Sequence, residues 1–146
     1  MQKLRHFCAY QERCHSEVRE KLFSLGVWMR DHDEIIAGLI EDNYLNEERF
    51  AIQYAGGHYR MKQWGRVKIK YALKQKGVSE YCIRKAMKQI EDEEYEKILE
   101  QLARKKYESL KGTQWIIRRK RTADYLVQKG YEPDLVRQAL DRISSP

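Results

Sequence analysis

The sequence has little that would break helices or carry it through a membrane. Only two prolines occur among 146 residues, Pro133 and Pro146, so long helical stretches run uninterrupted. The longest uncharged apolar run, residues 35–40, has six members, whereas a membrane span needs roughly 18 to 20. The first residues also lack the apolar core of a secretion signal. We therefore expect a cytoplasmic protein with no membrane contact.

Signatures of catalysis and of cofactor binding are missing as well. The sequence has no glycine-rich phosphate loop, no nucleophile elbow and no His-Glu-x-x-His motif. Gly56 and Gly57 stand together, but without the lysine that phosphate binding requires. These absences predict a protein that is not an enzyme, with no catalytic residue and no cofactor.

The cysteines and histidines near the N-terminus raise the question of a metal site. His6, Cys8, Cys14 and His15 fall within ten residues, and all are zinc-ligand types. On one helix Cys8 and Cys14 face different directions, whereas a break before Ser16 would let the cluster rearrange. The spacing matches no zinc finger or ribbon. We expect no metal, and three unpaired thiols, of which Cys8 and Cys14 pack in the core.

The acidic run at residues 31–34 could in principle ligate a cation. It lacks the glycine turn of a calcium loop, and adjacent acids at a helix start usually cap the helix and interact with its dipole. We interpret this run as a helix N-terminus.

Apolar residues recur every three to four positions along most of the chain, which predicts amphipathic helices throughout. In residues 64–76 the pattern assigns Ile69 and Leu73 to the core. Residues 114–129 form another such segment. Its apolar side holds Trp115, Ile116, Ala123, Leu126 and Val127, and its outer side holds Arg118, Arg121, Tyr125 and Lys129. Trp64 and Trp115 are expected between repeats, in the core.

Three glycines reveal an internal repeat. Gly26, Gly77 and Gly130 each end a periodic run, lie 51 and 53 residues apart, and follow a leucine by four residues. Each is typical of a helix C-terminal cap. Further helices are expected from about Asn46 to Arg60 and from about Asp92 to Leu110.

We therefore predict an all-α fold of tandem three-helix repeats, stacked into an elongated, curved array whose third repeat is truncated. The expected repeats are residues 1–61, 62–110 and 111–146.

Charge is abundant and segregated along the chain. Lys and Arg number 29 against 22 Asp and Glu, a net charge of +7, which favours polyanionic or acidic partners. Residues 60–76 contain seven basic residues and no acid, and residues 104–121 contain eight basic residues and one acid. Residues 31–48 contain seven acids and no Lys or Arg.

Arg66, Lys70 and Lys74, four residues apart, form one basic ridge along a helix, a geometry suited to following phosphates. The basic residues expected to contact nucleic acid or a partner are Arg60, Lys62, Arg66, Lys68, Lys70, Lys74, Arg118 and Arg121. The acidic residues expected to contact basic loops of a partner are Asp42, Glu47 and Glu48.

Four stretches together resemble the RecX family of regulators of the bacterial RecA recombinase. Residues 14–22 read CHSEVREKL, similar to the family's HSxxELxxKL. Residues 43–51 read NYLNEERFA, similar to its GYLDDxRFA, with Asn43 and Asn46 replacing Gly and Asp. Residues 64–79 read WGRVKIKYALKQKGVS, similar to GxxxIxxxLxxKGI, and residues 125–131 read YLVQKGY. The likeness extends from about residue 4 to residue 143.

The resemblance implies a non-catalytic modulator, mainly an inhibitor. A RecX protein would lodge as a monomer in the groove of the RecA filament on single-stranded DNA, with double-stranded DNA as a second nucleic-acid partner. It would suppress ATPase, coprotease and strand-exchange activity in recombination, DNA repair and the SOS response. Two alternatives stay open: an autonomous DNA-binding regulator that uses its basic helix faces, and a helical adaptor that binds only proteins. A salt-dependent DNA titration separates these two.

Overall fold

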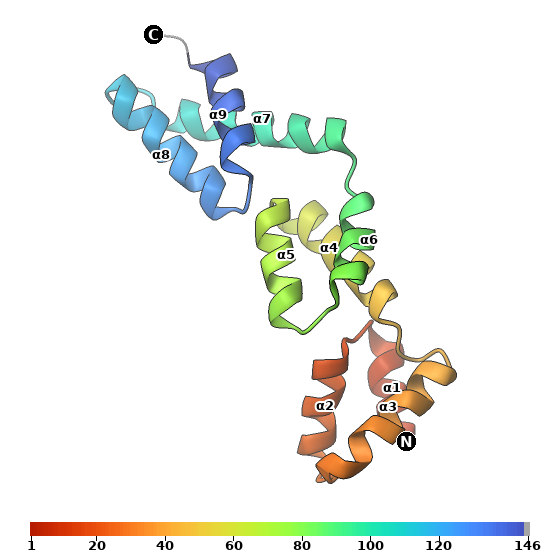
Figure 1. Ribbon diagram of the computed structural model, residues 1–146. Coiled ribbons are helices and arrows are strands. Elements are labelled where there is room, and N and C mark those ends of the chain that lie inside the picture. Colours follow the sequence, from red (N-terminus) through yellow and green to blue (C-terminus); the bar gives the residue numbers. More distant parts are fainter. Residues whose placement is uncertain (145–146) are drawn as a thin grey trace. The chain divides into compact units, whose positions relative to one another are not determined.

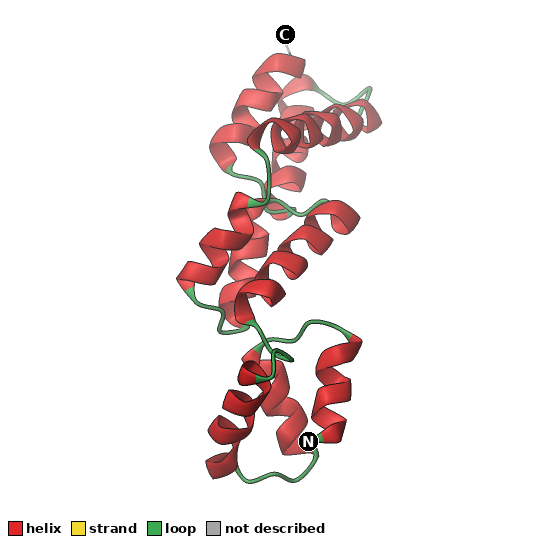
Figure 2. Ribbon diagram, turned by 90° about the vertical axis from the view of Figure 1, so that its right-hand side faces the viewer, coloured by secondary structure: helices red, strands yellow, loops and turns green. Residues whose placement is uncertain are grey.

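The computed structural model describes residues 1–144, and over that range the chain forms nine α-helices, one short 3-10 helix and no strand (Figures 1 and 2). The helices are α1 (Gln2–Tyr10), α2 (His15–Ser24), η1 (Met29–Asp31), α3 (His32–Glu41), α4 (Glu47–Lys62), α5 (Arg66–Gln75), α6 (Glu80–Lys88), α7 (Asp92–Ser109), α8 (Trp115–Gln128) and α9 (Pro133–Ile143). The all-α prediction is confirmed. Within residues 1–144 no helix has both the length and the apolar character needed to cross a bilayer.

The three predicted glycine caps have one common geometry. Gly26, Gly77 and Gly130 adopt φ of 77°, 78° and 103°, in the left-handed region that favours glycine. The amide N–H after each glycine donates to the leucine carbonyl five residues earlier, at 3.0, 3.1 and 3.1 Å. This bond defines the Schellman motif, which ends a helix and satisfies its last carbonyls. All three leucines, Leu22, Leu73 and Leu126, are fully buried.

The chain divides into two compact units, which are described separately. Unit 1 comprises residues 1–56 and 72–87, and unit 2 comprises residues 57–71 and 88–146. The division falls inside α4 and α5, so each of these helices contributes residues to both units.

The core of unit 1 forms where α1, α2 and α3 bury apolar side chains at helical spacing. It contains Leu4, Cys8, Val18, Leu22, Ile36, Leu39 and Leu45. Asn46 Oδ1 accepts the Arg49 N–H at 2.9 Å and so caps α4. Asn43, which replaces the family's glycine, has a φ of 63°, in the left-handed region that Asn tolerates.

The N-terminal segment forms two helices rather than one. α1 ends at Tyr10, and α2 begins at His15 after the Cys14 N–H donates to Glu17 Oε1 at 2.9 Å. Cys8 and Cys14 are buried, as predicted, and burial raises the pKa of both thiols. No group of three or more His, Cys, Asp or Glu side chains in the described residues is arranged to hold a metal ion.

In unit 2, α7 packs against both α8 and α9, and α8 against α9. Here one prediction is wrong. Ile116 is 65 % exposed, Val127 45 % and Trp115 37 %, so the apolar side assigned to this helix does not all face the core, and Trp115 is not a core residue. The buried positions of α8 are Thr122 and Leu126, one turn apart. α9 begins at Pro133, with Glu132 at its N-cap position.

Candidate nucleic-acid and partner interface

A tight backbone contact within unit 2 positions the residues around Trp64. The Gly65 N–H donates to the Lys129 carbonyl at 2.8 Å, and the Val67 N–H donates to the Gly130 carbonyl at 2.9 Å. A Cβ on Gly65 would lie 2.3 Å from the Gly130 carbonyl carbon, closer than any side chain allows. Glycine is therefore required at position 65, and the segment that carries Trp64 is fixed against the end of α8.

Trp64 is half-buried, and the ammonium groups of two lysines lie over its indole. The Lys68 ammonium lies 4.5 Å from the centre of the indole and the Lys62 ammonium 5.5 Å. Both distances are within the range of a cation–π interaction. The expectation that Trp64 belongs to the core is wrong, because its indole is only partly covered.

Tyr125 on α8 repeats this arrangement. The Lys106 ammonium lies 4.9 Å from its ring centre and the Lys129 ammonium 5.7 Å. Lys129 Nζ also donates to the Lys62 carbonyl at 3.1 Å, which links this ring to the Trp64 segment. We call the combined surface the Trp64 patch. It consists of Lys62, Trp64, Lys68, Lys106, Tyr125 and Lys129.

None of the four lysines of the Trp64 patch forms an ion pair with a carboxylate within residues 1–144. Such a surface can bind a phosphate backbone through lysines and a base through an aromatic face. Because the aromatic rings also hold the ammonium groups in place, less side-chain entropy is lost when a ligand binds.

Arg66 lies next to this patch, but its charge is used inside unit 2. Its guanidinium forms ion pairs with Asp92 and, at 3.5 Å, with Glu132, and lies 3.9 Å from the Tyr95 ring centre. Its side chain is only 17 % exposed. Tyr95 Oη donates to Glu132 and accepts the Arg66 N–H at 3.0 Å. Burial and the Glu132 hydrogen bond raise the Tyr95 pKa far above its usual value.

Two further predicted interface residues have internal partners. Arg118 Nε donates to the Tyr107 carbonyl at 2.7 Å while its guanidinium lies 3.6 Å from the Tyr107 ring centre. Glu47 Oε1 accepts the Ser79 N–H at 3.0 Å, at the start of α6. These contacts give Arg118 and Glu47 a structural role.

The other predicted interface residues face solvent to different degrees. Lys74 pairs with Glu80 at 3.3 Å, and Asp42 pairs with Arg5 at 3.7 Å, both through exposed side chains. Arg60, Lys70 and Arg121 are exposed, Glu48 is half-buried, and none of these four has an ion pair within the described residues. Isolated exposed pairs such as that of Lys74 contribute little to stability, so these charges stay available to a partner.

The structure adds Lys106, Tyr125 and Lys129 to the candidate residues. The sequence already placed Tyr125 and Lys129 on the outer face of residues 114–129, and that periodicity was the available signal. Nothing in the sequence brings Lys106 on α7 to the same ring, because that contact depends on how α7 packs against α8.

Together these features define a class: an all-helical repeat protein with a basic, aromatic surface. Comparison with known proteins identifies the family. Residues 46–87 match the second three-helix domain of RecX, and residues 92–140 match the third. These matches group α4–α6 and α7–α9 as successive three-helix units. The chain belongs to the RecX family.

Three relatives named "Regulatory protein RecX" illustrate the range of similarity. The protein of Prosthecochloris aestuarii is 30 % identical over 94 % of this chain and 88 % of its own length. That of Clostridium perfringens is 33 % identical over 88 % of this chain and 61 % of its own. That of Bacillus cytotoxicus is 26 % identical over 94 % of this chain, which spans only about half, 51 %, of that relative.

Solved structures support the fold. The crystal structure of RecX from Lactobacillus salivarius has a TM-score of 0.87 at 22 % identity, and covers 97 % of this chain and 92 % of its own. With the family matches, this likeness confirms the predicted tandem three-helix organisation. The predicted repeat boundaries at 61/62 and 110/111 lie at the ends of α4 and α7, not between the two matched domains, and stay a prediction.

Proposed function

We propose that this chain is a non-catalytic modulator, mainly an inhibitor, of a bacterial RecA recombinase. In this proposal it binds as a monomer in the groove of the RecA filament on single-stranded DNA, in the cytoplasm. It suppresses ATP hydrolysis, coprotease activity and strand exchange. Membership of a family of regulatory proteins supports the regulatory role.

The observation that carries the DNA part of the proposal is the Trp64 patch, where four lysines with no carboxylate partner within residues 1–144 contact two aromatic rings. Unpaired bases of a single strand present both phosphates and π-faces, whereas a duplex hides its bases in the stack. This chemistry favours a single strand over a duplex. Arg60, Lys70 and Arg121 supply further exposed positive charge in unit 2.

Contact with the recombinase itself is assigned to exposed charge. Asp42 and Glu48 supply acidic groups for basic loops of the partner. Glu47 instead accepts the Ser79 N–H and so has an indirect role, because it holds the start of α6 in place. Lys74, with its exposed ion pair, exchanges Glu80 for an acidic group of the recombinase. Arg66 and Arg118 do not contact the partner in this proposal; their internal contacts hold the binding surface in place.

The test is ATP hydrolysis by a bacterial RecA protein on single-stranded DNA, with this chain titrated from far below stoichiometric amounts. Inhibition at substoichiometric ratios is expected, because one molecule in a filament groove affects several subunits. A variant with Arg60, Lys62 and Lys68 changed to Glu should inhibit much less while its helicity is unchanged.

No inhibition together with tight binding to bare DNA would favour the autonomous DNA-binding regulator. No inhibition without DNA binding would contradict both functions and leave the protein-only adaptor.

A further inference from the structure

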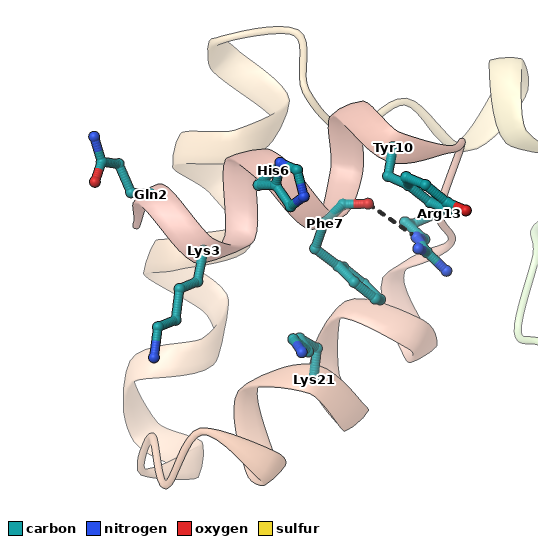
Figure 3. A pocket seen from close by; sticks show the side chains of 7 residues that line it. All are labelled: Gln2, Lys3, His6, Phe7, Tyr10, Arg13 and Lys21. Atoms are coloured by element: carbon teal, nitrogen blue, oxygen red, sulfur yellow. Dashed lines mark hydrogen bonds between the residues drawn. The ribbon is translucent and has the colours of Figure 1, made fainter.

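A second basic and aromatic surface lies in unit 1, far from the Trp64 patch in sequence. An open pocket of about 610 Å³ lies along α1 and α2, within the size range of small-molecule sites. It is lined by Gln2, Lys3, His6, Phe7, Tyr10, Arg13 and Lys21. Figure 3 shows Lys3 and Arg13 towards opposite ends, with Phe7 and Lys21 between them.

The pocket walls carry positive charge without compensation. No Asp or Glu is among the lining residues of this described segment. Six of the 11 basic side chains of unit 1 have no ion pair within residues 1–144, and three of these six, Lys3, Arg13 and Lys21, line this one pocket. His6 adds a fourth nitrogen donor. Uncompensated cations gathered in one pocket attract an anion with several charges.

The same pocket holds its cations by aromatic contacts. The Arg13 guanidinium lies 3.8 Å from the Phe7 ring centre while its Nε donates to the Phe7 carbonyl at 3.0 Å, and the Lys21 ammonium lies 5.5 Å from that ring. These contacts fix Arg13 with its terminal nitrogens still free to donate. A fixed guanidinium is a good donor to phosphate oxygens.

A planar ring can bind at the Arg13 end of the pocket. Tyr10 is 77 % exposed, unusually open for a large aromatic side chain, and Figure 3 shows it towards the same end of the pocket as Arg13. An aromatic face next to a guanidinium plane is a common site for a purine or pyrimidine ring.

From this combination of cations, pocket and aromatic face, we infer that the α1–α2 pocket binds a nucleoside diphosphate or triphosphate. The base stacks on Tyr10 beside Arg13, and the phosphates lie towards Lys21 and Lys3. A free nucleotide fits better than a DNA strand, since its phosphates gather several charges at one point whereas a strand offers one per nucleotide. With no carboxylate in the lining, binding needs no divalent cation.

The inference does not depend on the proposed function, so it is tested on the isolated 146-residue chain. ATP in excess EDTA is titrated into the isotope-labelled protein, and amide NMR shifts are followed. Saturable shifts are expected within residues 2–21. Lys3→Glu with Lys21→Glu should weaken ATP binding about tenfold or more, as each removed phosphate contact carries a charge-assisted bond.

The matched control is Arg84→Glu with Lys85→Glu, the same charge change on α6 of unit 1, which should leave ATP binding unchanged. Because the double reversal places two acids near α1, Lys3→Ala provides a milder variant on an exposed side chain if helicity falls. It should still weaken ATP binding measurably, and an unchanged affinity would overturn the assignment.

Titrations with three further ligands test which part of the nucleotide is bound. Adenosine should cause no saturable shift, and inorganic triphosphate should bind more weakly than ATP. If inorganic triphosphate binds as tightly as ATP, the nucleoside does not contribute to binding. If an oligothymidylate displaces ATP at a lower concentration than ATP itself requires, the pocket is a nucleic-acid site. Either result, or the absence of ATP-induced shifts at about 1 mM, overturns the inference.

Discussion

The two units carry equal numbers of acidic residues but very different numbers of basic ones. Unit 1 has 11 Lys or Arg and 11 Asp or Glu, and is neutral overall. Unit 2 has 18 and 11, so the whole net charge of +7 belongs to it. The excess in unit 2 is the basis of long-range attraction to a polyanion such as DNA.

The charge available to a partner depends on how many basic side chains are paired with carboxylates as well as on how many there are. In unit 1, five of the eight basic side chains outside the α1–α2 pocket form ion pairs within residues 1–144, for example Arg19 with Asp33 at 2.7 Å and Arg49 with Glu12 at 2.5 Å. In unit 2, the lysines of the Trp64 patch contact aromatic rings in place of carboxylates. A cation–π contact holds a lysine without cancelling its charge. Unit 2 therefore supplies the broad basic surface, and unit 1 supplies one local pocket.

The largest expected effect comes from reversing charge in the Trp64 patch. Lys62→Glu, Lys68→Glu and Lys129→Glu together should weaken binding to labelled single-stranded DNA about 100-fold at low salt. Loss of three phosphate contacts should also reduce the slope of log affinity against log salt by about 2. Fluorescence anisotropy at several salt concentrations measures both quantities.

The control makes the same charge change in unit 1, with Lys74→Glu, Arg84→Glu and Lys85→Glu. If DNA binding followed net charge alone, both triple variants would lose the same affinity. A loss in the unit 1 variant equal to that in the unit 2 variant would contradict the assignment of DNA contact to the Trp64 patch.

The second effect separates Arg66 from the other basic residues of α5. Arg66→Ala should lower the free energy of unfolding by about 2 kcal/mol, because it leaves Glu132 near Tyr95 without its cation. That value is below the range for fully buried pairs because Asp92 is 88 % exposed. Lys70→Ala, one turn along α5, should change stability by less than about 0.5 kcal/mol. Urea unfolding measures both, and equal losses would refute the internal role of Arg66.

Local sequence patterns predicted helices, caps and part of the core because these depend on neighbours a few residues away. Ile69 and Leu73 are fully buried, as their spacing indicated. The exposure of Ile116 and Val127 was not predictable in the same way, since the pattern shows an apolar side but not how much of it a partner helix covers.

The candidate site was less predictable than the fold. Arg66 and Lys70 look equivalent on a helical wheel, but the carboxylates that pair with Arg66 lie 26 and 66 residues along the chain. Likewise, Lys106 on α7 and Lys129, the residue after α8, contact the same ring. Charge counts reveal where positive residues are frequent, whereas tertiary packing decides which of them keep their charge exposed.

A third effect isolates the aromatic part of the Trp64 patch. Trp64→Ala should weaken binding to single-stranded DNA about tenfold, since stacking of one base contributes roughly 1 to 3 kcal/mol, and should change duplex binding much less. Trp115→Ala is the matched control: Trp115 is 37 % exposed in the same unit but lines a groove between α8 and α9. Equal losses for the two tryptophans, or equal losses for single strand and duplex, would argue against stacking on Trp64.

The smallest effect concerns alkaline pH, at which buried thiols and phenols ionise. Burial raises the pKa of Cys14 in unit 1 above the ordinary thiol value of 9.0, and raises the pKa of Tyr95 in unit 2 above the ordinary phenol value of 10.0. When a group has a raised pKa in the folded state, its contribution to stability is fully present below the unfolded-state pKa and is lost as pH rises towards the folded-state value.

The free energy of unfolding should therefore begin to fall near pH 9, where the thiols ionise in the unfolded chain, and fall more steeply above pH 10, where the phenols do. In urea unfolding at a series of pH values, Cys14→Ala should reduce the loss of stability near pH 9, with the Cys8 thiol accounting for the rest. Tyr95→Phe should flatten the decline above pH 10 even though it loses the Glu132 hydrogen bond. A Tyr95→Phe variant with an unaltered slope above pH 10 would show that the phenol keeps its ordinary pKa in the folded chain.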